Sequence, residues 1–218
     1  TPLEDFTGPR KWQEKILRDI GNHIRKNETI DMPEMFRLAV ASGRGIGKSA
    51  LVAWIILWML STRLGSTIIV TANTEAQLRT RTWAELGKWL TLSINGHWFQ
   101  KTATSLKPQQ WFEELLVRDL SIDCGYYYAQ QQLWSADSPD SFAGSHSFLG
   151  CMLVMDEASG IDKNIFSVSE GFFTEPTKNR FWLCFSNPRR NSGPFYDAFH
   201  SKREFWNTEQ IDSRDVEG

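Results

Sequence analysis

The chain has 218 residues, a length that buries one good core with small insertions, so we expect a single domain over residues 1–218. Hydrophobic residues make up 41% of the chain and charged residues 23%, the proportions of an ordinary soluble globular protein. The net charge of −2 does not suit bulk electrostatic attachment to nucleic acid, so any DNA contact has to be local and shared among several subunits.

The first half of the chain alternates predicted helices and buried strands. Residues 9–26 carry apolar side chains at spacings of three, four and seven, which predicts a helix with one buried face. Residues 36–41 predict a short buried strand that runs into a glycine-rich turn. Residues 49–63 are apolar almost all round, which indicates a central helix. A second buried strand is expected at 67–71, followed by a helix over about 74–90.

The stretch 95–135 has a different character, with aromatic-rich pieces at 109–116 and 126–134 that we interpret as added strands at a sheet edge. Residues 151–155 predict a third buried strand and residues 181–185 a fourth. Because these strands are apolar on both faces and alternate with helices, they predict a mostly parallel central sheet with helices on both faces, an α/β fold.

Composition also bears on the compartment. The three cysteines are widely spaced and form no C-x-x-C pair: Cys124, Cys151 and Cys184. This argues against a zinc site or a disulfide framework and suits a reducing cytosol. The longest apolar run, 51–60, is half of the roughly 20 residues that cross a bilayer, and no signal-peptide pattern opens the chain. We expect a cytoplasmic protein without membrane contact, and the start at Thr1 without a Met suggests a domain excised from a longer chain.

The strongest motif is SGRGIGKS at residues 42–49, which fits G-x-x-x-x-G-K-[ST] except at its first position. A strand precedes it and a helix follows it, so its glycines would turn successive N–H groups toward phosphates at the helix N-terminus. Lys48 would reach the β- and γ-phosphates of ATP, and the Ser49 hydroxyl would bind Mg²⁺. The expected nucleotide-binding residues of this motif are Gly43, Arg44, Gly45, Ile46, Gly47, Lys48, Ser49 and Ala50.

Two acids end the third strand. Asp156 would hold Mg²⁺ through its water shell, and Glu157 would orient and deprotonate the attacking water. The alternative is that both acids cap the next helix. Arg44 either neutralises charge on the transferred phosphoryl group or faces solvent. Ser186 and Asn187, at the tip of the fourth strand, either sense the γ-phosphate or form an Asn-Pro turn.

Other polar residues leave more than one interpretation open. The loop at 71–77, with Arg79 and Arg81 beyond it, either contacts a sugar–phosphate backbone or is a helix cap next to a solvated basic face. Arg189 and Arg190 either meet phosphate or form a solvated loop, and we favour the loop; His146 is interpreted as structural in preference to catalytic. The amide of Gln13 matches the donor and acceptor edge of adenine, although a glutamine on a helix means nothing by itself.

Together these motifs resemble the N-terminal ATPase domain of phage terminase large subunits, the motors that pump DNA into empty capsids. The matching residues are Pro9, Trp12, Gln13, the loop at 43–49, Thr71 to Thr74, Asp156 to Ala158, and Ser186 to Arg190. The resemblance implies a three-layer P-loop NTPase of the RecA-like (ASCE) type that covers the whole chain. It also implies an adenine-contacting Gln13, a catalytic Glu157 and Lys48, an Arg44 that senses the γ-phosphate, a magnesium-linked Asp156, and coupling through Ser186 and Asn187.

The same resemblance implies partners. Family members assemble as a homo-oligomeric ring at the portal protein of the procapsid, translocate double-stranded DNA, and work in the host cytoplasm with a small terminase subunit that selects the DNA. They carry a metal-dependent nuclease domain after the motor. No acidic cluster of that kind can be placed in residues 1–218, so we do not expect these residues to cut DNA.

Two alternatives remain. The first motor domain of a superfamily-two helicase shares the glutamine, the phosphate loop and the Asp-Glu pair, but usually has Ser-Ala-Thr where this chain has Ser186-Asn187-Pro188, and it needs a second motor domain. A non-hydrolysing nucleotide-binding assembly module is the other alternative. Glu157 argues against it, because such modules often lose the base while they keep the lysine.

Overall fold

The computed structural model describes residues 8–137, 139 and 147–214, so His146 lies outside the described residues. Its framework is an eight-stranded sheet in the order β3-β4-β5-β2-β6-β7-β1-β8. The strands are β1 (Phe36–Ser42), β2 (Thr67–Thr71), β3 (Phe99–Lys101), β4 (Ser105–Pro108), β5 (Tyr128–Gln131), β6 (Cys151–Asp156), β7 (Arg180–Ser186) and β8 (Asn207–Ile211). All neighbours from β5 to β8 pair in parallel, and only β3–β4 and β4–β5 pair antiparallel. The expected mostly parallel α/β sheet with added edge strands is confirmed.

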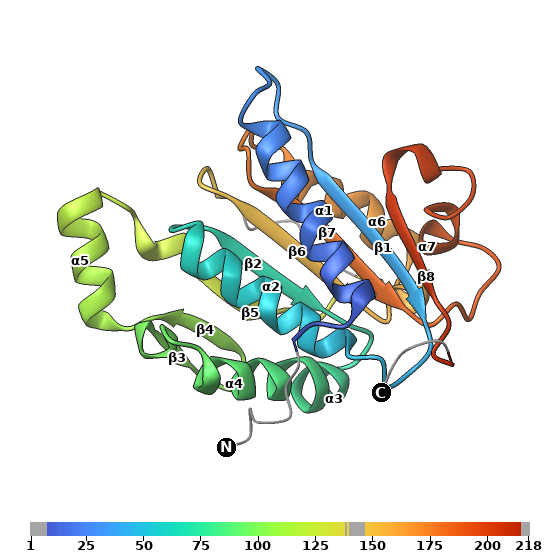
Figure 1. Ribbon diagram of the computed structural model, residues 1–218, viewed down its shortest axis with the longest axis horizontal. Helices are drawn as coiled ribbons and strands as arrows, with labels where there is room; N and C mark the ends of the chain where they lie inside the picture. The colour runs from blue at the N-terminus through green and yellow to red at the C-terminus, as the bar shows by residue number, and fades with distance from the viewer. Residues whose placement is uncertain (1–7, 138, 140–146, 215–218) are drawn as a thin grey trace.

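Helices cover both faces of this sheet. They are α1 (Lys11–Asn27), α2 (Lys48–Thr62), α3 (Glu75–Gln77), α4 (Trp83–Leu92), α5 (Gln110–Leu120), α6 (Lys163–Ser169) and α7 (Pro194–Asp197). A π-helical turn, η1 (Leu78–Thr82), joins α3 to α4. Figure 1 shows α1 and α2 crossing one face of the sheet.

The two faces carry separate cores because successive strand residues point to opposite sides. From β1, Phe36, Leu38 and Val40 enter a first cluster with the buried sides of α1, α2 and α4. Ala39 and Ala41 enter a second cluster with α6, α7 and the aromatic turn η6 (Glu170–Phe173). The small alanines leave room on the second face for bulky partners such as Trp182 and Phe173, whose rings stack.

The segment between β2 and β6 corrects two sequence predictions. Residues 109–116, expected as a strand, begin helix α5, because Phe112 and Leu116 are buried at helical spacing while Trp111 faces solvent. Within 126–134, β5 pairs in parallel with β2 and so lies inside the sheet, not at its edge. The added edge strands are β3 and β4. At three and four residues, they are too short to show a clear alternation of apolar and polar residues.

Two further differences affect the region next to the site. The helix expected over 74–90 is interrupted by η1, which inserts a wider turn between α3 and α4. Strand β8 was not predicted, because Asn207–Ile211 is polar and partly exposed at a sheet edge. Within the described ranges, no helix combines the length and the apolar character that a bilayer crossing requires.

Candidate nucleotide-binding site

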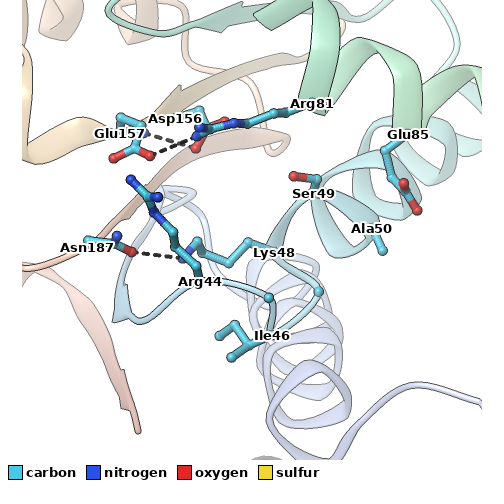
Figure 2. A pocket seen from close by; sticks show the side chains of 12 residues that line it. Arg44, Ile46, Lys48, Ser49, Ala50, Arg81, Glu85, Asp156, Glu157 and Asn187 are labelled. Carbon is cyan, nitrogen blue, oxygen red and sulfur yellow. Dashed lines mark hydrogen bonds and ion pairs between the residues drawn. The ribbon is translucent and has the colours of Figure 1, made fainter. Parts of the chain in front are cut away.

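The candidate site lies where three neighbouring parallel strands end on the same edge of the sheet. β1 ends in Ser42 and continues through the glycine-rich loop into α2, β6 ends in Asp156, and β7 ends in Ser186. Between these ends is a pocket of about 350 Å³ (Figure 2). Its described lining residues are Arg44, Gly45, Ile46, Gly47, Lys48, Ser49, Ala50, Arg81, Glu85, Asp156, Glu157 and Asn187.

Glycine is required at two places in the loop. Gly45 (φ 76°) and Gly47 (φ 89°) adopt left-handed backbone conformations, and Gly47 is the N-cap of α2. A Cβ at Gly47 would also lie only 2.8 Å from Nε2 of Gln13. The loop therefore wraps around the N-terminus of α2, where backbone N–H groups and the helix dipole favour an anion.

Helix α1 holds the loop from behind. Gln13 Nε2 donates to the Gly47 carbonyl at 2.9 Å, and Gln13 Oε1 accepts from the Arg10 backbone N–H at 2.9 Å. Arg10 Nη1 donates to the Gly45 carbonyl at 3.4 Å. Gln13 is only 3% exposed and does not line the pocket. Its amide therefore contacts the back of the loop and does not face the pocket.

Lys48 begins α2 and folds back into the loop. Its Nζ donates to Ser42 Oγ (2.9 Å), the Gly43 carbonyl (2.6 Å) and Asn187 Oδ1 (3.4 Å). Burial lowers the pKa of Lys48, and the nearby charges of Asp156 and Glu157 oppose that shift. The ammonium group thus lies among loop carbonyls and acids at the floor of the pocket, where an anionic ligand would find a partly desolvated cation.

Asp156 is held at the end of β6 by two hydrogen bonds. Its Oδ2 accepts from Thr82 Oγ1 at 3.1 Å, and its Oδ1 accepts from the Glu157 backbone N–H at 3.0 Å. Burial raises the pKa of Asp156, and the Thr82 hydrogen bond acts in the opposite direction. Ser49 lines the same pocket. One hydroxyl and one carboxylate are hard oxygen ligands, and Mg²⁺ commonly takes one or two such ligands together with substrate phosphates. The donor set therefore fits Mg²⁺.

Glu157 turns away from the strand direction. Its backbone lies in the left-handed region (φ 55°, ψ 40°), which is uncommon for a residue other than glycine and tends to occur at functional sites. Asn73 Nδ2 donates to its carbonyl at 3.2 Å, and Arg81 Nη1 lies 3.1 Å from its Oε1. Figure 2 shows the carboxylate facing the tip of Arg44 on one side and Arg81 on the other.

Three residues that the sequence assigned to the site do not line the pocket. Gln13 is behind the loop, and Gly43 packs so closely on the segment after β8 that a Cβ there would lie 2.5 Å from Ser213 Oγ. Ser186 is buried beneath the site, where its Oγ donates to Ser159 Oγ at 2.7 Å. The other expected residues, from Arg44 to Ala50 with Asp156, Glu157 and Asn187, are brought together in one pocket.

Arg81, Thr82 and Glu85 contact or line the site, although sequence reasoning does not assign them to it. The sequence groups Arg81 with Arg79 as a nucleic-acid contact or a solvated face. Both arginines are exposed, but Arg81 lines the pocket and Arg79 does not. The cap interpretation of this loop is confirmed for Thr74, whose side chain accepts from Gln77 N–H. No local sequence motif marks Arg81 as a site residue. Its side chain contacts Glu157 from the π-helical turn η1, which the sequence does not predict.

The strand order, the parallel pairing and the glycine-rich loop between β1 and α2 define a fold of the RecA-like P-loop type. No protein-family model matches the chain. The chain is 26% identical over 169 residues to the probable terminase large subunit of Enterobacteria phage P7, a match that covers 74% of this chain and 31% of that protein.

Solved structures with a similar fold are also phage large terminases. The large terminase of a thermophilic bacteriophage, in complex with ADP, superposes with a TM-score of 0.62 at 14% identity, over 94% of this chain and 45% of that one. The large terminase ATPase domain of Thermus phage P74-26 gives a TM-score of 0.56 at 16% identity, over 86% and 78%. The expected resemblance is therefore confirmed: the chain is similar to phage terminase large subunits and has the fold of their ATPase domains. It spans about a third of the P7 protein and under half of the ADP-bound terminase.

Proposed function

We propose that residues 1–218 form the ATPase motor domain of a phage terminase large subunit, which hydrolyses ATP to move double-stranded DNA into a procapsid. The observation that carries this proposal is that Lys48, Asp156 and Glu157 converge on one pocket at the ends of neighbouring parallel strands. The similarity to a terminase large subunit and the ADP complex of a protein with the same fold support it.

The roles of the residues follow from their chemistry. The loop N–H groups and Lys48 would hold the β- and γ-phosphates, and Ser49 and Asp156 would hold Mg²⁺. When bound, Mg²⁺ neutralises negative charge on the phosphate oxygens. Glu157 accepts a proton from the attacking water, whose oxygen bonds to the γ-phosphorus while the bond to the β–γ bridging oxygen breaks, leaving ADP and phosphate. Arg44 stabilises charge on the transferred group.

Ser186 and Asn187 are proposed as the coupling element. Asn187 Oδ1 accepts from Lys48 in the loop, and the Asn187 carbonyl accepts from Ser159 Oγ at 3.1 Å, just after the acid pair. Ser186 Oγ accepts from the Ser159 N–H at 3.1 Å. The tip of β7 thus contacts both the lysine and the segment after Glu157, so a shift in either on phosphate release would move it.

The assembly partners are proposed from the similarity to terminases alone. They are double-stranded DNA, the portal protein of a procapsid, a small terminase subunit, and further copies of the chain in a ring, all in the host cytoplasm. Adding procapsid and DNA to the full-length protein should raise its ATPase rate. A rate that does not respond to either addition would contradict the packaging role while leaving ATP hydrolysis intact.

Two substitutions test the ATPase assignment. Glu157→Gln keeps the shape of the side chain but removes the base, so ATP binding should persist while turnover falls by about 100-fold or more. Lys48→Ala should lose nucleotide affinity. Binding is measured with a fluorescent ATP analogue and turnover by phosphate release. Unchanged hydrolysis in Glu157→Gln would remove Glu157 from its role, and a wild-type chain that binds ATP without any turnover would favour the non-hydrolysing module.

A further inference from the structure

Arg81 lines the pocket, and the proposed reaction assigns no role to its positive charge. It lies in the π-helical turn η1, far from both the phosphate loop and the acid pair in sequence, and its Nη1 is 3.1 Å from Oε1 of Glu157. In Figure 2 the side chain of Arg81 extends toward the acid pair, and the side chain of Arg44 extends toward Glu157 from the loop. The proposed base is therefore held in an ion pair by a residue from a different element.

The turn that carries Arg81 is packed into the protein, whereas the arginine side chain is about half exposed. Leu78 and Trp83 are buried in the first core cluster, and Thr82 is buried and bonds Asp156. The side chain of Arg81 is 46% exposed, whereas that of Glu157 is 14% exposed. Arg81 thus has a firmly anchored backbone and a long side chain with freedom to change partner.

Charge decides which partner Arg81 prefers. The pocket is lined by three cations and three acids: Arg44, Lys48, Arg81, Glu85, Asp156 and Glu157. A triphosphate adds several negative charges to this balanced set. An ion pair whose arginine is half exposed is weak, whereas a guanidinium makes strong, often bidentate hydrogen bonds to phosphate. On these grounds a γ-phosphate in the pocket would be a stronger partner for Arg81 than Glu157 is.

We propose, on the basis of the proposed ATPase function, that Arg81 exchanges partners during the cycle. It pairs with Glu157 until a nucleoside triphosphate enters, and then moves to the γ-phosphate. The exchange frees Oε1 of Glu157 to accept the proton of the attacking water only when a γ-phosphate is present. Glu157 keeps its place because its backbone is held by Asn73 independently of Arg81. Arg81 is thus a positioning residue for Glu157 and a discriminator of triphosphate from diphosphate.

A double-mutant cycle on nucleotide affinity tests the exchange. The wild type, Arg81→Ala, Glu157→Gln and the double variant are titrated with Mg²⁺ and either ADP or a non-hydrolysable ATP analogue. Arg81→Ala should weaken the analogue by about tenfold, the effect of losing a charged hydrogen bond, and leave ADP within about twofold. Glu157→Gln should tighten the analogue several-fold in the wild-type background, because the competitor is removed, and should have a much smaller effect in Arg81→Ala.

Further variants separate this role from a structural one. Arg81→Lys keeps one charge and should restore part of the discrimination between the analogue and ADP. Arg18→Ala and Glu14→Gln break an exposed arginine–glutamate pair on α1, away from the pocket, and should change neither affinity. Equal weakening of both nucleotides by Arg81→Ala, or additive effects of Arg81→Ala and Glu157→Gln, would overturn the exchange.

The same titrations distinguish this inference from the proposed function. A wild-type chain that binds neither nucleotide, or a Lys48→Ala variant that binds as the wild type does, would overturn the nucleotide site and the exchange together. A wild-type chain that binds both nucleotides through Lys48, with discrimination that does not depend on Arg81, would overturn the exchange alone.

Discussion

The side-chain amide of Gln13 joins helix α1 to the phosphate loop. Gln13 bonds the first turn of its own helix through Oε1 and the Gly47 carbonyl through Nε2, with almost no exposure to solvent. The resemblance to terminases implies that Gln13 reads adenine, and that role stays a prediction. The two hydrogen bonds of its amide give Gln13 a further effect that does not depend on the base, since they fix the loop that is proposed to bind the phosphates.

Replacing Gln13 by Ala should therefore weaken ATP and GTP to a similar extent, by several-fold, because the loss of about one hydrogen bond loosens the loop. Competition against a fluorescent nucleotide measures both affinities. Gln110→Ala removes a similar amide that bonds Glu114 on the exposed side of α5, and it should change neither. A loss confined to ATP would show that Gln13 acts by contacting adenine instead.

The residues of the site differed in how predictable they were. The loop at 42–49 and the acid pair at 156–157 are recognisable because each is a short local pattern next to a buried strand, and parallel strands bring such ends together. Arg81 was not predictable as a pocket residue. Its position depends on one π-helical turn, which no residue pattern in Leu78–Thr82 announces.

At the scale of elements, the C-terminal end of α1 is fastened to the sheet by one buried side chain. Asn27 Nδ2 donates to the carbonyls of Glu34 (2.9 Å) and Lys178 (3.1 Å), and its Oδ1 accepts from the Glu34 N–H at 3.1 Å. The same Nδ2 lies 3.1 Å from Nε2 of His23. Asn27 thus connects the helix to the chain before β1 and to the chain before β7.

Asn27→Ala should lower the free energy of unfolding by about 2–4 kcal/mol, because it removes three hydrogen bonds that a buried side chain makes to the backbone. Urea unfolding followed by tryptophan fluorescence measures the change. Asn22→Ala, at an exposed position on the same helix, should stay within about 0.5 kcal/mol of the wild type. Equal stabilities of the two variants would contradict the fastening role.

The elements that sequence analysis placed wrongly share a physical reason. Helix α5 was interpreted as a strand because its aromatic residues dominate the pattern, although only Phe112 and Leu116 turn inward. β8 was missed because an edge strand pairs through its backbone on one side and leaves polar residues such as Glu209 and Gln210 on it. The central strands were predictable, since burial on both faces requires continuous apolar runs.

At the scale of the whole molecule, two central strands hold the two cores together. Alternate residues of β6 and β7 enter the first and the second cluster, so Met152 and Val154 face one side while Cys151 and Leu153 face the other. Two of the cysteines lie on these strands, Cys151 on β6 and Cys184 on β7, and both are buried. Cys124 is half-buried in the turn that precedes β5.

Thiol labelling therefore reports the opening of the sheet. Burial raises the pKa of Cys151 to about 12 and that of Cys184 well above its usual value. At pH 8 a chromogenic disulfide reagent should label Cys124 first, with the other two slower by a factor on the order of 1,000 or more. All three should react quickly in urea. Cys124→Ser should abolish the fast phase, and a second fast thiol in the native protein would contradict the two-core arrangement.

The way β6 and β7 are shared between the cores has a consequence for amide protons. Backbone groups sandwiched between two packed layers exchange with deuterium only when the domain opens as a unit, and these strands end in Asp156 and Ser186. The acid proposed as the base follows directly after a segment that should be among the slowest to exchange, whereas the side chain of Arg81 opposite it is 46% exposed. The ion pair between Arg81 and Glu157 joins this exposed side chain to the residue that directly follows β6.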